Sequence, residues 1–93
     1  MPDRVAGFML ERVISSYLLC HRHAPEECPV AFAAWKGFSS PLRRRVTFAS
    51  CATGGHEVWW TVEATDPEAA LALLPPCVAT RTAAIAVREV VIP

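Results

Sequence analysis

Apolar positions along this 93-residue chain gather in four stretches that predict β-strands. Residues 14–23 carry apolar side chains on both faces of an extended segment, which is typical of a central strand. Residues 45–52 and 56–64 flank the short Thr53-Gly54-Gly55 loop, and this arrangement favours a hairpin. Residues 84–92 form the last apolar stretch. The pattern therefore predicts a protein with four strands.

Two helices are predicted between these strands. Residues 26–36 follow a proline and begin with acidic side chains, which favour a helix start, and apolar residues then recur at helical spacing. The second helix is expected to start at the capping box Thr65-Asp66-Pro67-Glu68. Because a proline inside a helix removes a hydrogen bond, Pro75-Pro76 is expected to kink or break this element before it ends near Thr82.

The elements over residues 14–93 follow the order strand, helix, strand, strand, helix, strand. This order predicts a single α+β domain of the ferredoxin-like βαββαβ type, with a four-stranded antiparallel sheet and two helices on one face. Residues 1–13 are interpreted as an N-terminal extension, because their apolar positions are irregular. In this topology the strands lie in the order fourth, first, third, second, so the first and third are expected to be neighbours.

The first and third strands can be aligned so that apolar side chains face apolar ones and a cation faces an anion, which is how register is usually fixed. The predicted pairs are Tyr17 with Val62, Leu19 with Trp60, Arg22 with Glu57 and His23 with His56. This register brings all three histidines of the chain to one end of the sheet.

The hairpin register decides which face of the sheet carries the cysteine at position 51. Pairing Ala52 with His56 places Phe48 in the helix-facing core. Cys51 and Trp59 then fall on the opposite face, where a mixed surface is a candidate dimer interface or the wall of a ligand cavity. A slip of one residue would move Cys51 to the histidine side, so both placements stay open.

Composition and charge exclude several classes of partner. Nine basic residues balance nine acidic ones, which removes the positive footprint expected of a nucleic-acid-binding protein or of a protein held on anionic lipid. No apolar run approaches the roughly 20 residues that span a bilayer, and the N-terminus does not resemble a secretory signal. We therefore expect a cytoplasmic protein with no membrane partner, in which the four cysteines are reduced.

The pattern of strands and helices from Tyr17 to Pro93 resembles that of small ferredoxin-like proteins, among them the dimeric α/β-barrel group. The resemblance implies a homodimer in which two sheets pack against each other. It also implies a range of functions, because members of this group include small monooxygenases, isomerases, metal-binding proteins and purely structural proteins.

The segment from Cys20 to Cys28 is dense in groups that bind metals: two histidines, two cysteines and two adjacent carboxylates. Histidines at i and i+2 of a strand point the same way, and imidazole nitrogen together with thiolate suits zinc, nickel or copper. The candidate metal ligands are therefore His21, His23 and His56, with Cys28 or Glu27 as the fourth. The alternative is that the histidines are half-exposed residues at the rim of the sheet and that Cys28 is a small buried hydrophobe.

Two other functions fit the same residues. His23 or His56 would serve as a general base in a small-molecule site with an aromatic wall, although core packing also accounts for the aromatic residues. A chain this apolar and this close to zero net charge also suits association, as a homodimer or with a protein partner, with Trp59 as the anchor.

We expect first a small ligand-binding or metal-binding protein that uses the histidine end of the sheet. The alternative is an accessory subunit or a dimeric α/β-barrel enzyme that acts on a small apolar substrate. Whether the protein is an enzyme stays open at this point, because the sequence contains no nucleophile elbow, phosphate loop or dinucleotide fingerprint.

Overall fold

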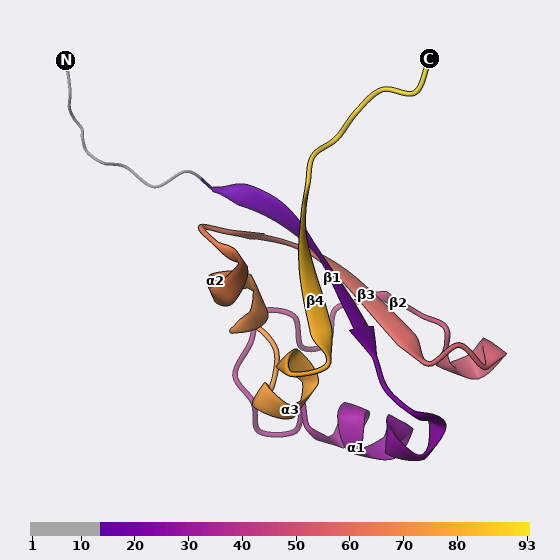
Figure 1. Cartoon of the computed structure of the whole chain (residues 1–93). Helices are drawn as coiled ribbons and strands as arrows, with labels where there is room; N and C mark the ends of the chain where they lie inside the picture. The colour runs from indigo at the N-terminus through magenta and orange to yellow at the C-terminus, as the bar shows by residue number, and fades with distance from the viewer. Residues whose placement is uncertain (1–13) are drawn as a thin grey trace.

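The computed structural model describes residues 14–93, and the predicted extension of residues 1–13 lies outside the described residues. In the described part, the chain forms an α+β fold whose four-stranded antiparallel open sheet carries the short helices on one face (Figure 1). The strands are β1 (Ser15–Arg22), β2 (Phe48–Ala49), β3 (Glu57–Ala64) and β4 (Thr82–Val87). The helices are α1 (Cys28–Ala33), α2 (Pro67–Leu71) and α3 (Pro76–Ala79), with 3-10 turns η1 (Pro25–Glu27) and η2 (Cys51–Thr53).

β1 and β3 are the long central strands of the sheet, whose order is β2-β3-β1-β4. The register predicted between these two strands is confirmed. The observed pairs include Tyr17 with Val62, Leu19 with Trp60 and Arg22 with Glu57. The pairing continues past the end of β1, where the backbone N–H of His23 donates to the carbonyl of His56 at 3.2 Å.

The core lies between the helices and the face of the sheet that they cover. Leu19 of β1 is fully buried, and Leu74 and Val78 from the helical side belong to the same buried cluster. Trp60 of β3 packs against Trp35, with the two ring centroids 5.7 Å apart. These two tryptophans therefore belong to the packing of the core, as one of the two sequence interpretations held.

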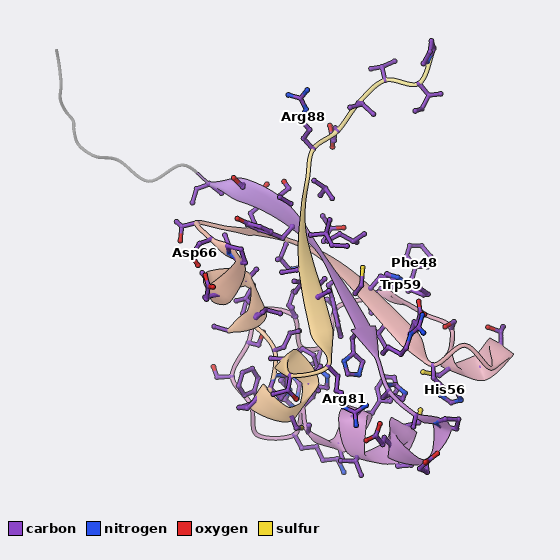
Figure 2. The ribbon with its side chains drawn as sticks, viewed as in Figure 1. Phe48, His56, Trp59, Asp66, Arg81 and Arg88 are labelled. Atoms are coloured by element: carbon purple, nitrogen blue, oxygen red, sulfur yellow. The ribbon has the colours of Figure 1, made fainter. Side chains whose placement is uncertain are left out.

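The predicted hairpin register is wrong by one residue. Phe48 pairs with Trp59 rather than with Trp60. Phe48 therefore lies on the outer face of the sheet with 83% of its surface exposed, whereas Cys51 packs against the core on the helix-covered side. Figure 2 shows Phe48 and Trp59 close together on the side of the sheet away from the helices.

The turn between β2 and β3 sets this register, and the pairing of apolar side chains across the two strands does not. The loop after β2 contains η2, then Gly54 with φ 92° and His56 with φ 54°. Ser50 closes the loop, because its backbone N–H donates to the carbonyl of Glu57 at 2.8 Å and its hydroxyl accepts from the backbone N–H of Glu57 at 3.0 Å. β2 has two residues, so its apolar contacts are too few to override the turn.

The helical segments are shorter than the sequence predicts. The first predicted helix, residues 26–36, is divided into η1 and the six-residue α1. The second is capped by Asp66, whose side chain accepts from the backbone N–H of Ala69 at 2.7 Å, and it is broken at Pro75-Pro76 into α2 and α3. None of the helices within residues 14–93 has the length and apolar character needed to cross a bilayer.

The last strand is displaced from its predicted position at residues 84–92. β4 begins at Thr82, and its last pair with β1 joins Val87 to Ser16. β1 begins at Ser15, one residue before the last residue that pairs with β4. Residues 88–93 instead leave the sheet as an exposed arm (Figure 1).

Candidate metal centre

Four side chains that suit a transition metal meet at one end of the sheet. They are His23, Cys28, Cys51 and His56, and we call them the CCHH group. Each offers one ligand atom, and these four atoms all lie within 4.8 Å of one another. His23 is buried and the other three residues are half-buried, so the group is shielded from solvent without being sealed.

Separate elements bring these residues together. His23 follows β1, and Cys28 is the first residue of α1. Cys51 is the first residue of η2, and His56 comes directly before β3. Because β1 pairs with β3, the two histidines lie opposite each other with ring centroids 5.4 Å apart. The group therefore depends on long-range strand pairing as well as on two local turns.

His56 has two unusual features. Its backbone has a φ of 54°, a left-handed conformation that residues with a Cβ atom seldom adopt. Its ring atom Nδ1 is buried and has no hydrogen-bond partner among the described residues. A buried polar atom without a partner costs free energy, and coordination of a metal by Nδ1 itself would offset this cost. Figure 2 shows His56 between the hairpin loop and α1.

The two cysteines of the group are neighbouring free thiols. Burial raises the pKa of the Cys51 thiol, and the hydrogen bond and charge of Cys28 raise it further. Two adjacent thiolates repel each other in the metal-free protein, whereas a bound cation favours both thiolates. Sγ of Cys51 also lies 3.6 Å from Nε2 of His23. The two thiols therefore lie close enough to bind the same cation.

His21 lies outside the CCHH group, although it is one of the ligands predicted from the sequence. Its side chain is buried, with 3% of the residue exposed, and its Nε2 lies 3.0 Å from Nδ1 of His23. Its Nδ1 lies 3.2 Å from the carbonyl oxygen of Val78 and 3.1 Å from the hydroxyl of Thr82. Burial lowers the pKa of His21, and the hydrogen bond with the Val78 carbonyl opposes this shift. His21 therefore contacts a member of the group without joining it.

Glu27, the other choice for the fourth ligand, has its carboxylate engaged elsewhere. Oε1 accepts from the backbone N–H of Ala24 at 2.8 Å, and Oε2 accepts from the Arg81 guanidinium at 2.7 Å. The Ala24 hydrogen bond is the main reason why the pKa of the Glu27 carboxyl is lowered, and the charge of Arg81 adds to it. The carboxylate therefore links η1 to the residue before β4.

The aromatic side chains near the histidines leave little free space. The cavity beside them has a volume of about 10 Å³, roughly the room of one water molecule. It is lined by His21, His23, Ala31, Phe32, Trp35, Val58, Trp60 and Val78. A larger depression of about 240 Å³ reaches from the histidines toward Cys77 and Arg81. The packed aromatic residues thus leave no room for an apolar substrate between their rings.

Cys51 is the member of the group whose side of the sheet the sequence leaves open, because its placement depends on the hairpin register. A signal for it exists in the spacing, because four residues separate His23 from Cys28 and four also separate Cys51 from His56. Each turn at this end of the sheet thus carries one histidine and one cysteine. The second pair becomes recognisable only when the hairpin register is known.

Comparison of the chain with protein-family models, curated protein sequences and solved structures finds no match.

Proposed function

We propose that the protein binds one divalent transition metal ion through the CCHH group, and that the ion is zinc. Two thiolates and two imidazole nitrogens are donors that zinc prefers, and zinc binds them in tetrahedral geometry. Nickel and copper use the same kinds of donor atom but in their divalent states favour square-planar or tetragonal sites.

The separation of two ligand atoms is the observation that carries this proposal. In a tetrahedral zinc site, bonds of about 2.3 Å to sulfur and about 2.0–2.1 Å to nitrogen place a sulfur and a nitrogen ligand about 3.6 Å apart. Nε2 of His23 and Sγ of Cys51 lie 3.6 Å apart, and no ligand pair in the group exceeds 4.8 Å. Small side-chain movements would therefore suffice to bring all four atoms onto one ion.

The number of protein ligands supports a structural role for the metal. Four protein ligands leave no open position for a substrate, which is typical of structural zinc sites. α1 has no buried residue of its own, and a domain of this size has a small core. The ion would tie the start of α1 and the hairpin loop to the end of β1. A reducing compartment such as the cytoplasm suits this role, because it keeps both thiols available.

The metal content of untagged protein purified without chelator tests the proposal, with plasma mass spectrometry as the measurement. We expect about one zinc ion per chain and its loss in the Cys51→Ala variant. Cys20→Ala is the matched control, because Cys20 pairs with Trp59 and lies on the outer face of the sheet. A metal-free protein that also fails to bind cobalt(II), or equal metal loss in both variants, would overturn the proposal.

We also propose that the outer face of the sheet forms a homodimer interface, in keeping with the ferredoxin-like relationship that the order of strands and helices supports. Within residues 14–93, no helix packs on this face. Phe48 and Trp59 are paired across two strands there, and Ile85 on β4 is 47% exposed. Exposed aromatic and aliphatic side chains gathered in one patch are typical of association sites.

Light scattering tests the dimer. We expect the mass of two chains for the unsubstituted protein and a shift toward one chain in Trp59→Ala, because aromatic anchors supply much of the binding energy of an interface. Val30→Ala is the control, since Val30 is 64% exposed on α1, a helix on the other side of the sheet. A monomeric protein would contradict the homodimer, and an equal effect of both substitutions would contradict the outer face as its interface.

A further inference from the structure

The groups around His21 determine which of its ring nitrogens carries a proton. The Val78 carbonyl can only accept a hydrogen bond. The Thr82 hydroxyl donates its own proton to that same carbonyl, with 2.7 Å between the two oxygens, so it faces His21 as an acceptor. Both partners of His21 Nδ1, at 3.2 and 3.1 Å, are therefore acceptors, and Nδ1 carries the proton.

The position of this proton determines whether the other ring nitrogen of His21, Nε2, donates or accepts a hydrogen bond. His21 is almost fully buried, and burial favours the neutral ring, which has one proton. Its Nε2 therefore presents a lone pair toward Nδ1 of His23, 3.0 Å away. A hydrogen bond between the rings then requires the proton to be on Nδ1 of His23. Nε2 of a neutral His23 keeps its lone pair, and this is the atom that lies 3.6 Å from Sγ of Cys51.

We propose that His21 is a positioning residue, which holds His23 in the tautomer whose Nε2 is free to bind the metal. This inference rests on the proposed metal site. The chain of contacts runs from the Val78 carbonyl through His21 to His23. A metal-binding histidine commonly donates its second N–H to a partner that orients the ring and raises its basicity. Here a second imidazole would take the place that a carboxylate or carbonyl usually has.

Nitrogen NMR of the metal-free protein tests the tautomers directly. Long-range proton–nitrogen correlation of ¹⁵N-labelled protein at about pH 8, where neutral imidazole predominates, distinguishes protonated from unprotonated ring nitrogens. We expect the Nδ1–H tautomer for both His21 and His23. An Nε2–H tautomer of either ring would overturn the inference, because Nδ1–H of His23 could then no longer donate to a lone pair on Nε2 of His21. This experiment needs no substitution and therefore does not depend on a variant that folds.

Zinc affinity measured by competition with a chelating dye tests the consequence for binding. His21→Leu removes the acceptor, and we expect a loss of about 10–100-fold in affinity. His21→Gln keeps a side-chain oxygen acceptor, and we expect it to stay within about threefold of the unsubstituted protein. Equal affinity of His21→Leu and the unsubstituted protein, or equal weakening in both variants, would refute a positioning role. The latter result would indicate that the ring matters only for packing.

The two measurements also separate this inference from the metal site on which it rests. If the unsubstituted protein binds no zinc, the proposed metal site fails, while the NMR spectrum still decides how His21 and His23 are hydrogen-bonded. If the unsubstituted protein binds zinc and His21→Leu binds it equally well, the metal site stands and the positioning role fails.

Discussion

Replacing His56 with glycine separates two effects of this residue. Its imidazole belongs to the CCHH group, so the proposed zinc site needs it. Its backbone has a φ of 54°, a conformation that costs about 1–2 kcal/mol for a residue with a Cβ atom and little for glycine. We therefore expect His56→Gly to stabilise the metal-free protein and to destabilise the zinc-bound protein relative to the unsubstituted chain.

The magnitudes follow from the surroundings of the ring. Without metal, the substitution relieves the backbone cost and removes the buried Nδ1, which has no hydrogen-bond partner within residues 14–93 and whose burial costs about 1–3 kcal/mol. Two effects oppose this gain. The greater flexibility of glycine in the unfolded chain lowers the free energy of unfolding by about 0.4–1 kcal/mol, and loss of the packing of the half-buried ring lowers it by about 1–2 kcal/mol. The expected result is a gain of about 1 kcal/mol in the free energy of unfolding.

With zinc the sign reverses. At a free zinc concentration about 1,000 times the dissociation constant, binding adds about 4 kcal/mol to the free energy of unfolding of the unsubstituted protein. A variant that lacks one of the four ligands loses most of this contribution. We therefore expect His56→Gly to be less stable than the unsubstituted protein by about 3 kcal/mol under these conditions.

Urea unfolding followed by circular dichroism, once with EDTA and once in a zinc buffer, measures both differences. His56→Ala is the control, because it removes the same ligand but keeps the Cβ atom. It should be less stable than His56→Gly by about 1 kcal/mol in either buffer. Equal destabilisation of His56→Gly in both buffers would refute this prediction, since zinc would then have no differential effect.

Packing, helix capping and burial each give one further prediction, all measured by urea unfolding of the metal-free protein. Leu19 is fully buried, so Leu19→Ala should lower the free energy of unfolding by about 3–5 kcal/mol, and a loss below about 1 kcal/mol would contradict its place in the core. Asp66→Ala removes the acceptor that caps α2 and should cost about 0.5–2 kcal/mol, whereas Asp66→Asn keeps an acceptor and should cost less. Burial lowers the pKa of His21, so below about pH 6.5 the unfolded chain binds more protons than the folded one. Stability should therefore fall as the pH falls below about 6.5, and His21→Gln should show a smaller fall if this histidine is responsible.

The pairing of β1 with β3 could be predicted from the sequence because each strand has eight residues with alternating burial. A slip of one residue would move every core side chain of such a strand to the outer face, so one register is strongly favoured. This pairing also brings His23 opposite His56. The hairpin gives no comparable signal, since β2 has two residues and its apolar Phe48 lies on the exposed face. Its register depends on the hydrogen bonds of Ser50, which a hydrophobic pattern does not reveal.

The members of the CCHH group could be predicted only in part, because strand pairing is visible in the hydrophobic pattern and the positions of the loops are not. A strand period of two places His21 and His23 on one face, but it does not say how far along the strand each lies from the loops. His21 is paired with Val58 inside the ladder, where Val78 of α3 and Thr82 of β4 contact its ring. His23 lies one step beyond β1, beside the turn that carries Cys51. Two histidines that look equivalent in the sequence thus have different surroundings. His23 is a proposed metal ligand, whereas His21 contacts this ligand.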